Sequence, residues 1–133
     1  MTNPVQAITF PDRSQQIAAL MARQQKQRET PTILSKADYL EAVLRLLTLA
    51  QTDCGGARVA AQVLLSAYNG STWHCNLTDL CNLDTANYRA ALIVIRARVE
   101  LNQEPQRMID DGEAVFDALE EDWQAYHVSN RHR

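Results

Sequence analysis

The chain has 133 residues and a net charge of −3, with 46% apolar and 22% charged residues. This length and composition support one folded core without metals or disulfides, which excludes the disordered class of proteins. A nucleic-acid-binding protein usually carries a basic stripe or a basic domain. Residues 107–126 instead hold one arginine and seven carboxylates, so nucleic acid is a disfavoured partner, although it is not excluded.

The cellular compartment follows from the cysteines and from the apolar segments. The three cysteines, Cys54, Cys75 and Cys81, cannot all pair with one another. The first thirty residues lack the apolar run of a secretory signal, and no apolar segment reaches the roughly 18 residues that a membrane span needs. We therefore expect a cytoplasmic protein with reduced thiols and no membrane contact.

Residues 1–34 predict an N-terminal arm outside the core. Two prolines border a short apolar patch in residues 1–11, which indicates extended backbone, and residues 8–10 are the one place where a strand is allowed. Asp12 or Ser14 can cap a helix over 13–27. Its apolar face is thin, and a single helix of this kind is marginal in water. That face consists of Ile17, Leu20 and Met21.

The predicted core domain spans 35–127 and begins with its most apolar helix. Ser35, followed three residues later by Asp38, predicts the start of a helix over 36–51. Apolar residues cover most of its circumference, which is typical of a helix packed on several sides, so we expect it at the centre. Such a helix can need more cover than one small chain supplies, which makes a homodimer an alternative.

Glycines and polar turn residues divide the next part of the chain. Gly55-Gly56 predicts a break, followed by a helix over 57–68 that Asn69-Gly70 ends. A short helix is expected near 77–82, pinned to the core by its leucines.

A second long helix is predicted over 85–101, capped by Asp84 or Thr85. Its core stripe is expected to be Tyr88, Leu92, Ile95 and Val99, widened by Ala91 and Val94.

The end of the chain is predicted to be helical and then loose. Pro105 suits the first turn of a helix, and Asp111-Gly112 predicts a split into a short piece near 105–110 and a longer helix near 112–127. One continuous bent helix is the alternative. Residues 128–133 are expected to be a loose tail. The whole pattern predicts an all-α fold: a compact bundle of about five helices with an extended N-terminal arm.

His74, Cys75 and Cys81, with Cys54 as a fourth ligand, are the candidate metal set. Zinc ligands usually pair across two to four intervening residues, whereas five residues separate Cys75 from Cys81. The spacing favours Cys75 and Cys81 as small buried residues. Neighbours such as His74 and Cys75 seldom face each other as base and nucleophile. The sequence therefore predicts no metal, no cofactor, no catalytic residue and no enzyme.

Trp73 and His74 lie in a loop and are candidate interaction residues. An exposed tryptophan there would be an interface anchor. The favoured alternative is that Trp73 closes one end of the core.

The last helix offers a second candidate surface. Glu113, Asp117 and Glu120 are expected on the face opposite its apolar residues. Such a face is ordinarily solvated; the alternative is an acidic surface that docks a basic partner.

The segment 77–101 has the order of a helix-turn-helix, in which Arg89 and Arg96 lie seven residues apart on one face of the second helix. Against this interpretation, the turn is short and acidic residues crowd the same region. Arg98 is expected to be half-buried and paired with a carboxylate.

One stretch of the chain resembles an uncharacterised family of small proteobacterial proteins that are often carried on plasmids, prophages and integrating elements. The resemblance covers roughly residues 38–123. It rests on Gly55-Gly56-Ala57-Arg58-Val59-Ala60, Leu64-Leu65-Ser66-Ala67-Tyr68-Asn69-Gly70, Trp73, Leu77-Thr78-Asp79-Leu80 and Leu83-Asp84.

The resemblance implies a bacterial accessory protein and brings no activity or functional residue with it. The function therefore stays unknown. The favoured interpretation is a non-enzymatic accessory protein that binds an unidentified protein partner; the alternative is a small nucleic-acid-binding regulator that uses 77–101.

Overall fold

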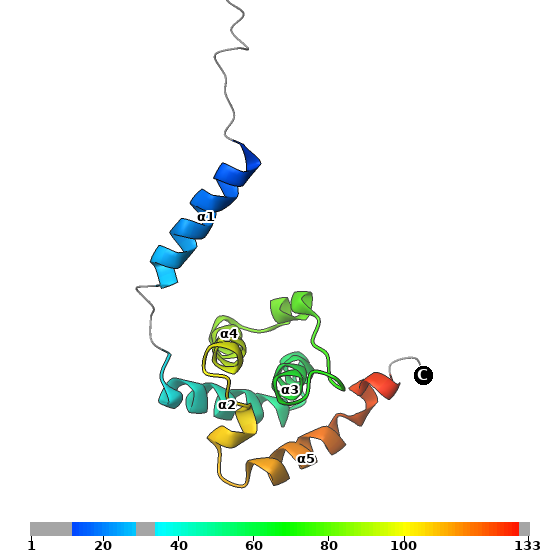
Figure 1. The fold of residues 1–133 in the computed structure, drawn as a ribbon. Coiled ribbons are helices and arrows are strands. Elements are labelled where there is room, and N and C mark those ends of the chain that lie inside the picture. Colours follow the sequence, from blue (N-terminus) through cyan, green and yellow to red (C-terminus); the bar gives the residue numbers. More distant parts are fainter. Residues whose placement is uncertain (1–11, 29–33, 131–133) are drawn as a thin grey trace, which may run out of the picture. The chain divides into compact units, whose positions relative to one another are not determined.

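The computed structural model describes residues 12–28 and 34–130, and within these ranges it contains helices and no strand (Figure 1). The all-α fold class is thus confirmed. The chain divides into two compact units, Met1–Ile33 and Leu34–Arg133. The extended arm and the strand that the sequence allows within residues 1–11 lie outside the described residues.

The first unit contains helix α1, Arg13–Arg28, close to the predicted range of 13–27. The N–H of Gln16 donates to the carbonyl oxygen of Asp12, which closes the first turn. The three large apolar side chains of this helix, Ile17, Leu20 and Met21, are between 51% and 63% exposed.

Three long helices form the centre of the second unit: α2 (Lys36–Ala50), α3 (Gly55–Tyr68) and α4 (Thr85–Glu100). Each of them packs against the other two. Figure 1 shows α3 and α4 side by side, viewed along their axes, with α2 running across them. Both predicted N-caps are present: the hydroxyl of Ser35 accepts from the N–H of Asp38, and the carboxylate of Asp84 accepts from that of Asn87.

The remaining segments are short and cover the edges of this three-helix centre. They are the 3-10 helices η2 (Leu77–Asn82), η3 (Pro105–Met108), η4 (Gln124–Tyr126) and η5 (Val128–Asn130), together with α5 (Gly112–Asp122). The predicted split before residue 112 is present, with a left-handed backbone at Asp111, φ 54°. The α-helix ends at Asp122 rather than near 127, and the chain continues as a 3-10 turn.

Three further predictions, on the start of α3, on the tail and on α2, also differ from the structure. Gly55 and Gly56 do not break the chain but form the first turn of α3. The predicted loose tail is ordered as far as Asn130, because the N–H of Val128 donates to the carbonyl oxygen of Thr72 at 3.0 Å; residues 131–133 lie outside the described residues.

The third difference concerns α2. Its buried face is central as predicted, but Leu40 and Leu44 are 36% and 48% exposed. The expectation that apolar residues would be buried around most of this helix is therefore wrong on one side.

Tyr39 on α2 is fully buried, and its hydroxyl donates to the carbonyl oxygen of Gln103 at 2.8 Å. Burial raises the pKa of Tyr39 to about 12, against about 10 in an unfolded chain. The folded state therefore holds the phenolic proton more tightly. The contribution of Tyr39 to stability is complete below pH 10 and is lost as the pH rises from 10 to 12.

We expect the free energy of unfolding to fall by roughly 2–3 kcal/mol more in the wild type than in Tyr39→Phe across this pH window. Urea titrations at stepped pH would measure the difference between the two proteins, in which the other titrating groups cancel. Parallel pH profiles for the two would show that Tyr39 does not titrate in this way.

Candidate protein-binding surface

Helix α4 carries two apolar rows on nearly opposite faces. The row that faces α2 and α3 is rich in alanine and consists of Ala90, Ala91, Val94 and Ala97, all buried. The other row consists of Tyr88, Leu92, Ile95 and Val99, which are 41%, 37%, 38% and 76% exposed. We call this second row the α4 stripe. The prediction that it faces the core is therefore wrong.

Side-chain size explains why the alanine row is the buried one. The distance between two packed helices depends on the side chains at their contact, and small residues allow a close approach. Helix α4 must pack against α2 and α3 at once. Alanines on its inner face let both neighbours come close, and the larger side chains are left on the outer face.

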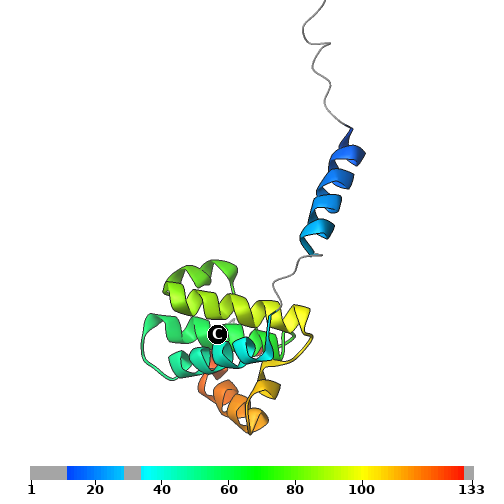
Figure 2. The same cartoon turned by 90° about the vertical axis from the view of Figure 1, so that its left-hand side faces the viewer.

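The η2 segment extends the apolar surface at the first turns of α4. Figure 2 shows η2 alongside α4. Residues of η2, the following turn and α4 line a hollow of about 360 Å³: Leu77, Leu80, Cys81, Leu83, Thr85 and Tyr88. Leu80 is buried and pins η2 to the core as predicted, but Leu77 is 74% exposed and widens the exposed apolar surface. A contiguous exposed apolar surface on a folded domain is a candidate interaction site.

Arginines border the α4 stripe. Arg89 and Arg96 lie on one flank and are both exposed. Arg96 forms an ion pair with Glu100, one turn further along the helix. Arg98 is half-buried as predicted, but its partners are the carbonyl oxygen of Ala67 and the side chain of Asn102 rather than a carboxylate.

This arrangement does not resemble the surface of a DNA-reading helix. The face of α4 that Arg89 and Arg96 flank is apolar, whereas a helix in the major groove presents polar side chains to base edges and phosphates. The segment before α4 is a 3-10 helix rather than the first α-helix of a helix-turn-helix.

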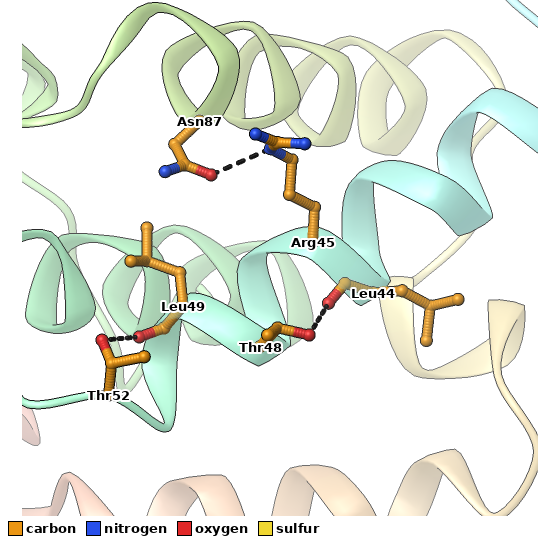
Figure 3. A pocket seen from close by; sticks show the side chains of 6 residues that line it. All are labelled: Leu44, Arg45, Thr48, Leu49, Thr52 and Asn87. Atoms are coloured by element: carbon orange, nitrogen blue, oxygen red, sulfur yellow. Dashed lines mark hydrogen bonds between the residues drawn. The ribbon is translucent and has the colours of Figure 1, made fainter.

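A second hollow, of about 460 Å³, lies on the outer side of α2 (Figure 3). Its polar side chains are already engaged: Arg45 donates to Asn87, and the hydroxyls of Thr48 and Thr52 donate to backbone carbonyl oxygens of α2. Figure 3 shows the side chain of Leu44 pointing away from Arg45. The hollow therefore presents few free polar groups to a ligand.

Trp73 is part of the core, as the favoured interpretation predicted. Its side chain is 1% exposed, so the alternative of an exposed anchor does not hold. Its indole N–H donates to the carboxylate of Glu120 at 3.0 Å, and its ring lies edge-on to that of His127, with 5.2 Å between the ring centroids. Glu120 is half-buried and holds Trp73, which removes it from the predicted solvated acidic face.

The other members of the predicted acidic set remain on the surface. Glu113 and Asp117 are exposed on α5, and the hydroxyl of Tyr68 donates to Glu113 at 3.4 Å. Burial, together with these carboxylates, raises the pKa of Tyr68. The sequence-predicted site residues are thus not gathered in one place: Arg89 and Arg96 border the α4 stripe, Trp73 and Glu120 form an internal pair, and His74 is exposed in the loop before η2.

The cysteines do not form a cluster with His74. Cys54 and Cys81 are exposed and Cys75 is half-buried, so the expectation that Cys81 is buried is wrong. Within the described ranges, no group of three or more histidine, cysteine or acidic side chains is placed to hold a metal ion.

Cys54 and Cys75 differ in their surroundings and should differ in reactivity. The hydroxyl of Thr52, 3.0 Å from the sulfur, and the N–H of Gly56 at the start of α3 lower the pKa of the Cys54 thiol. Burial and the nearby Asp79 raise the pKa of the Cys75 thiol. Because the thiolate is the nucleophile, Cys54 has more of the reactive form near neutral pH.

We expect iodoacetamide to alkylate Cys54 faster than Cys75 in the native protein. Peptide mass spectrometry over a time course would measure both rates, and in denaturant the two thiols should react alike. Faster alkylation of Cys75 in the native protein would contradict the assignment.

The fold defines this molecule as a small helical bundle, and the α4 stripe leaves a row of large apolar side chains exposed on its surface. The model of a family of unknown function, DUF7673, matches residues 40–124, and the chain belongs to that family. The match runs from α2 to the end of α5 and includes the α4 stripe. No curated protein and no solved structure matches the chain. None of the helices in the described ranges is long and apolar enough to cross a membrane.

Proposed function

We propose that the protein is a non-enzymatic accessory protein that acts by binding another protein, and that the α4 stripe is the binding surface. One observation carries the proposal: four large apolar side chains in a row, Tyr88, Leu92, Ile95 and Val99, are left exposed on a helix whose opposite face is fully packed. Burial of such a row against a partner removes apolar area from water, which is the main driving force of protein association.

The setting of this function is part of the proposal. The resemblance to proteobacterial proteins carried on mobile elements supports a bacterial accessory role. The apolar segments, all too short for a membrane span, support action in the cytoplasm.

Affinity capture from the native cell tests the surface. The full-length chain is compared with the double variant Ile95→Gln/Val99→Gln, in which glutamine keeps helix propensity and removes the second half of the apolar row. The matched control is Leu40→Gln/Leu44→Gln, which changes two exposed leucines on α2. We expect the α4 variant alone to lose the partner.

Two outcomes would argue against the proposed surface. One is equal capture by the α4 variant and the wild type. The other is capture by the α4 variant together with its loss from a chain that starts at Ser35, which would place the binding function before the core.

A further inference from the structure

The spacing of the α4 stripe indicates the shape of its partner. Tyr88, Leu92, Ile95 and Val99 follow one another at intervals of four, three and four residues. This is the heptad spacing at which two α-helices pack along each other, with each apolar side chain inserted between those of the facing helix. The occupant that matches the stripe is therefore a helix with an apolar row of its own, lying along α4.

The hollow beside η2 provides an anchor point at one end of the α4 stripe. Its walls include Leu77, Leu83 and the ring of Tyr88, and Leu77 is largely exposed. A concave apolar site next to an exposed row is where one large side chain of a bound helix contributes most to affinity. The α4 stripe and the hollow thus form one continuous docking surface.

The charges beside the seam indicate the chemistry of the partner. Helix α4 contains three arginines and one glutamate, a net charge of +2 in a chain whose net charge is −3. Arg89 is exposed at the flank of the stripe and forms no ion pair within the described part of the chain. Residues at the flanks of a heptad seam select the partner through charge. Acidic residues on the incoming helix complement this flank.

A second copy of α4 does not supply this complement. Its one acidic residue, Glu100, already pairs with Arg96, and the carboxylate of the N-cap residue Asp84 is bonded by Asn87. In an antiparallel pair of α4 helices, Arg89 of one copy would lie opposite Arg96 of the other, and like charges in facing flanks oppose association.

We infer that the α4 stripe receives an amphipathic helix of another protein, whose apolar row is bordered by glutamates or aspartates. This inference rests on the proposed function and adds the chemical class of the partner. The bound helix lies along Tyr88 to Val99, places a large apolar side chain in the hollow beside η2, and presents its carboxylates to Arg89.

Two synthetic peptides test the inference with the full-length protein. Both carry the same leucines at heptad positions; one has glutamate and the other lysine at every flanking position, so that each repels its own kind and stays monomeric. Fluorescence anisotropy at low salt measures their binding. We expect the glutamate peptide to bind about tenfold more tightly than the lysine peptide, with a preference that shrinks as salt is added.

Variants separate the apolar from the charged contribution. Ile95→Gln/Val99→Gln should lose the binding of both peptides, whereas Leu40→Gln/Leu44→Gln should bind them as the wild type does. Arg89→Glu should abolish or reverse the preference for the glutamate peptide. Arg107→Glu, an equal change of charge at an exposed position of η3, should leave that preference unchanged. Far-UV circular dichroism of each variant confirms that the helices are retained.

Four outcomes would overturn the inference. Equal binding of both peptides would show that the charges beside the stripe do not select the partner. Binding of neither peptide, while the α4 variant still loses its cellular partner, would reject the acidic helix and leave the proposed function standing. A dimer by light scattering that Ile95→Gln/Val99→Gln converts to a monomer would make a second copy the occupant. If the protein retains duplex DNA and Arg89→Glu abolishes this retention, Arg89 serves nucleic-acid binding instead.

Discussion

Replacing Gly112 with alanine should destabilise the protein by at least about 3 kcal/mol. Gly112 is the first residue of α5 and is buried against η3. A Cβ at this position would overlap the carbonyl oxygen of Gln106 and lie only 2.6 Å from its carbonyl carbon. Because these are backbone atoms, no rotation of a side chain relieves the overlap, and η3 and α5 must move apart.

The measurement is urea unfolding followed by circular dichroism, with Gly55→Ala as the matched control. Gly55 also lies in the first turn of a helix, but a Cβ there meets no atom of the described structure within 4 Å. The control should be neutral or stabilising by up to about 1 kcal/mol, because alanine has the higher helix propensity. An unfolding midpoint for Gly112→Ala equal to that of the wild type would contradict the close approach.

The prediction for Gly112 illustrates a general limit of the sequence pattern in this chain. Asp111-Gly112 correctly predicted a break, since both residues are common in turns. The left-handed residue of this break is Asp111, with φ 54°. Gly112 is needed for space, and the atom that limits the space belongs to a different helix. That information is absent from the local sequence.

The starts of α2 and α4 were predictable because their capping hydrogen bonds are local. Ser35 caps the N–H of Asp38, and Asp84 caps that of Asn87, each across three residues. A side chain and a backbone group this close in sequence form the same bond in almost any fold that contains the helix. The order of the helices and the all-α class follow from such signals together with the helical spacing of the apolar residues.

The buried face of α4 was not predictable from apolar spacing alone. The pattern contains two rows, and side-chain size favours the row that the structure leaves exposed. The choice between them depends on how closely α2 and α3 approach, which in turn depends on the small size of Ala90, Ala91 and Ala97. The residues of the α4 stripe are therefore visible in the sequence, but their spacing alone predicts that they face the core.

Trp73 and Glu120 show the same limit for a polar contact. They are 47 residues apart, and each was predicted as a surface residue in at least one interpretation. Their hydrogen bond joins the loop before η2 to α5. It forms only when α5 packs against α3, so the local sequence cannot predict it. The acidic pattern of α5 therefore overstates its solvated face by one residue.

Replacing Trp73 with alanine should cost about 3–5 kcal/mol of stability, because it removes a fully buried aromatic side chain. The loss also leaves the half-buried carboxylate of Glu120 without its indole donor. Trp73→Phe keeps most of the apolar volume and should cost distinctly less. Glu120→Gln retains an oxygen that can accept from the indole N–H, and its cost should be smaller still.

Urea unfolding of these three variants measures the order of their stability losses. Peptide binding tests whether Trp73 belongs to the interaction surface. Since Trp73 lies inside the core and not on the α4 stripe, Trp73→Phe should bind the glutamate peptide as the wild type does. A cost below about 1 kcal/mol for Trp73→Ala, combined with loss of binding in Trp73→Phe, would place the tryptophan on the interaction surface. The expected result, a large loss of stability with unchanged binding, separates the residue that holds the bundle together from the α4 row proposed to bind the partner.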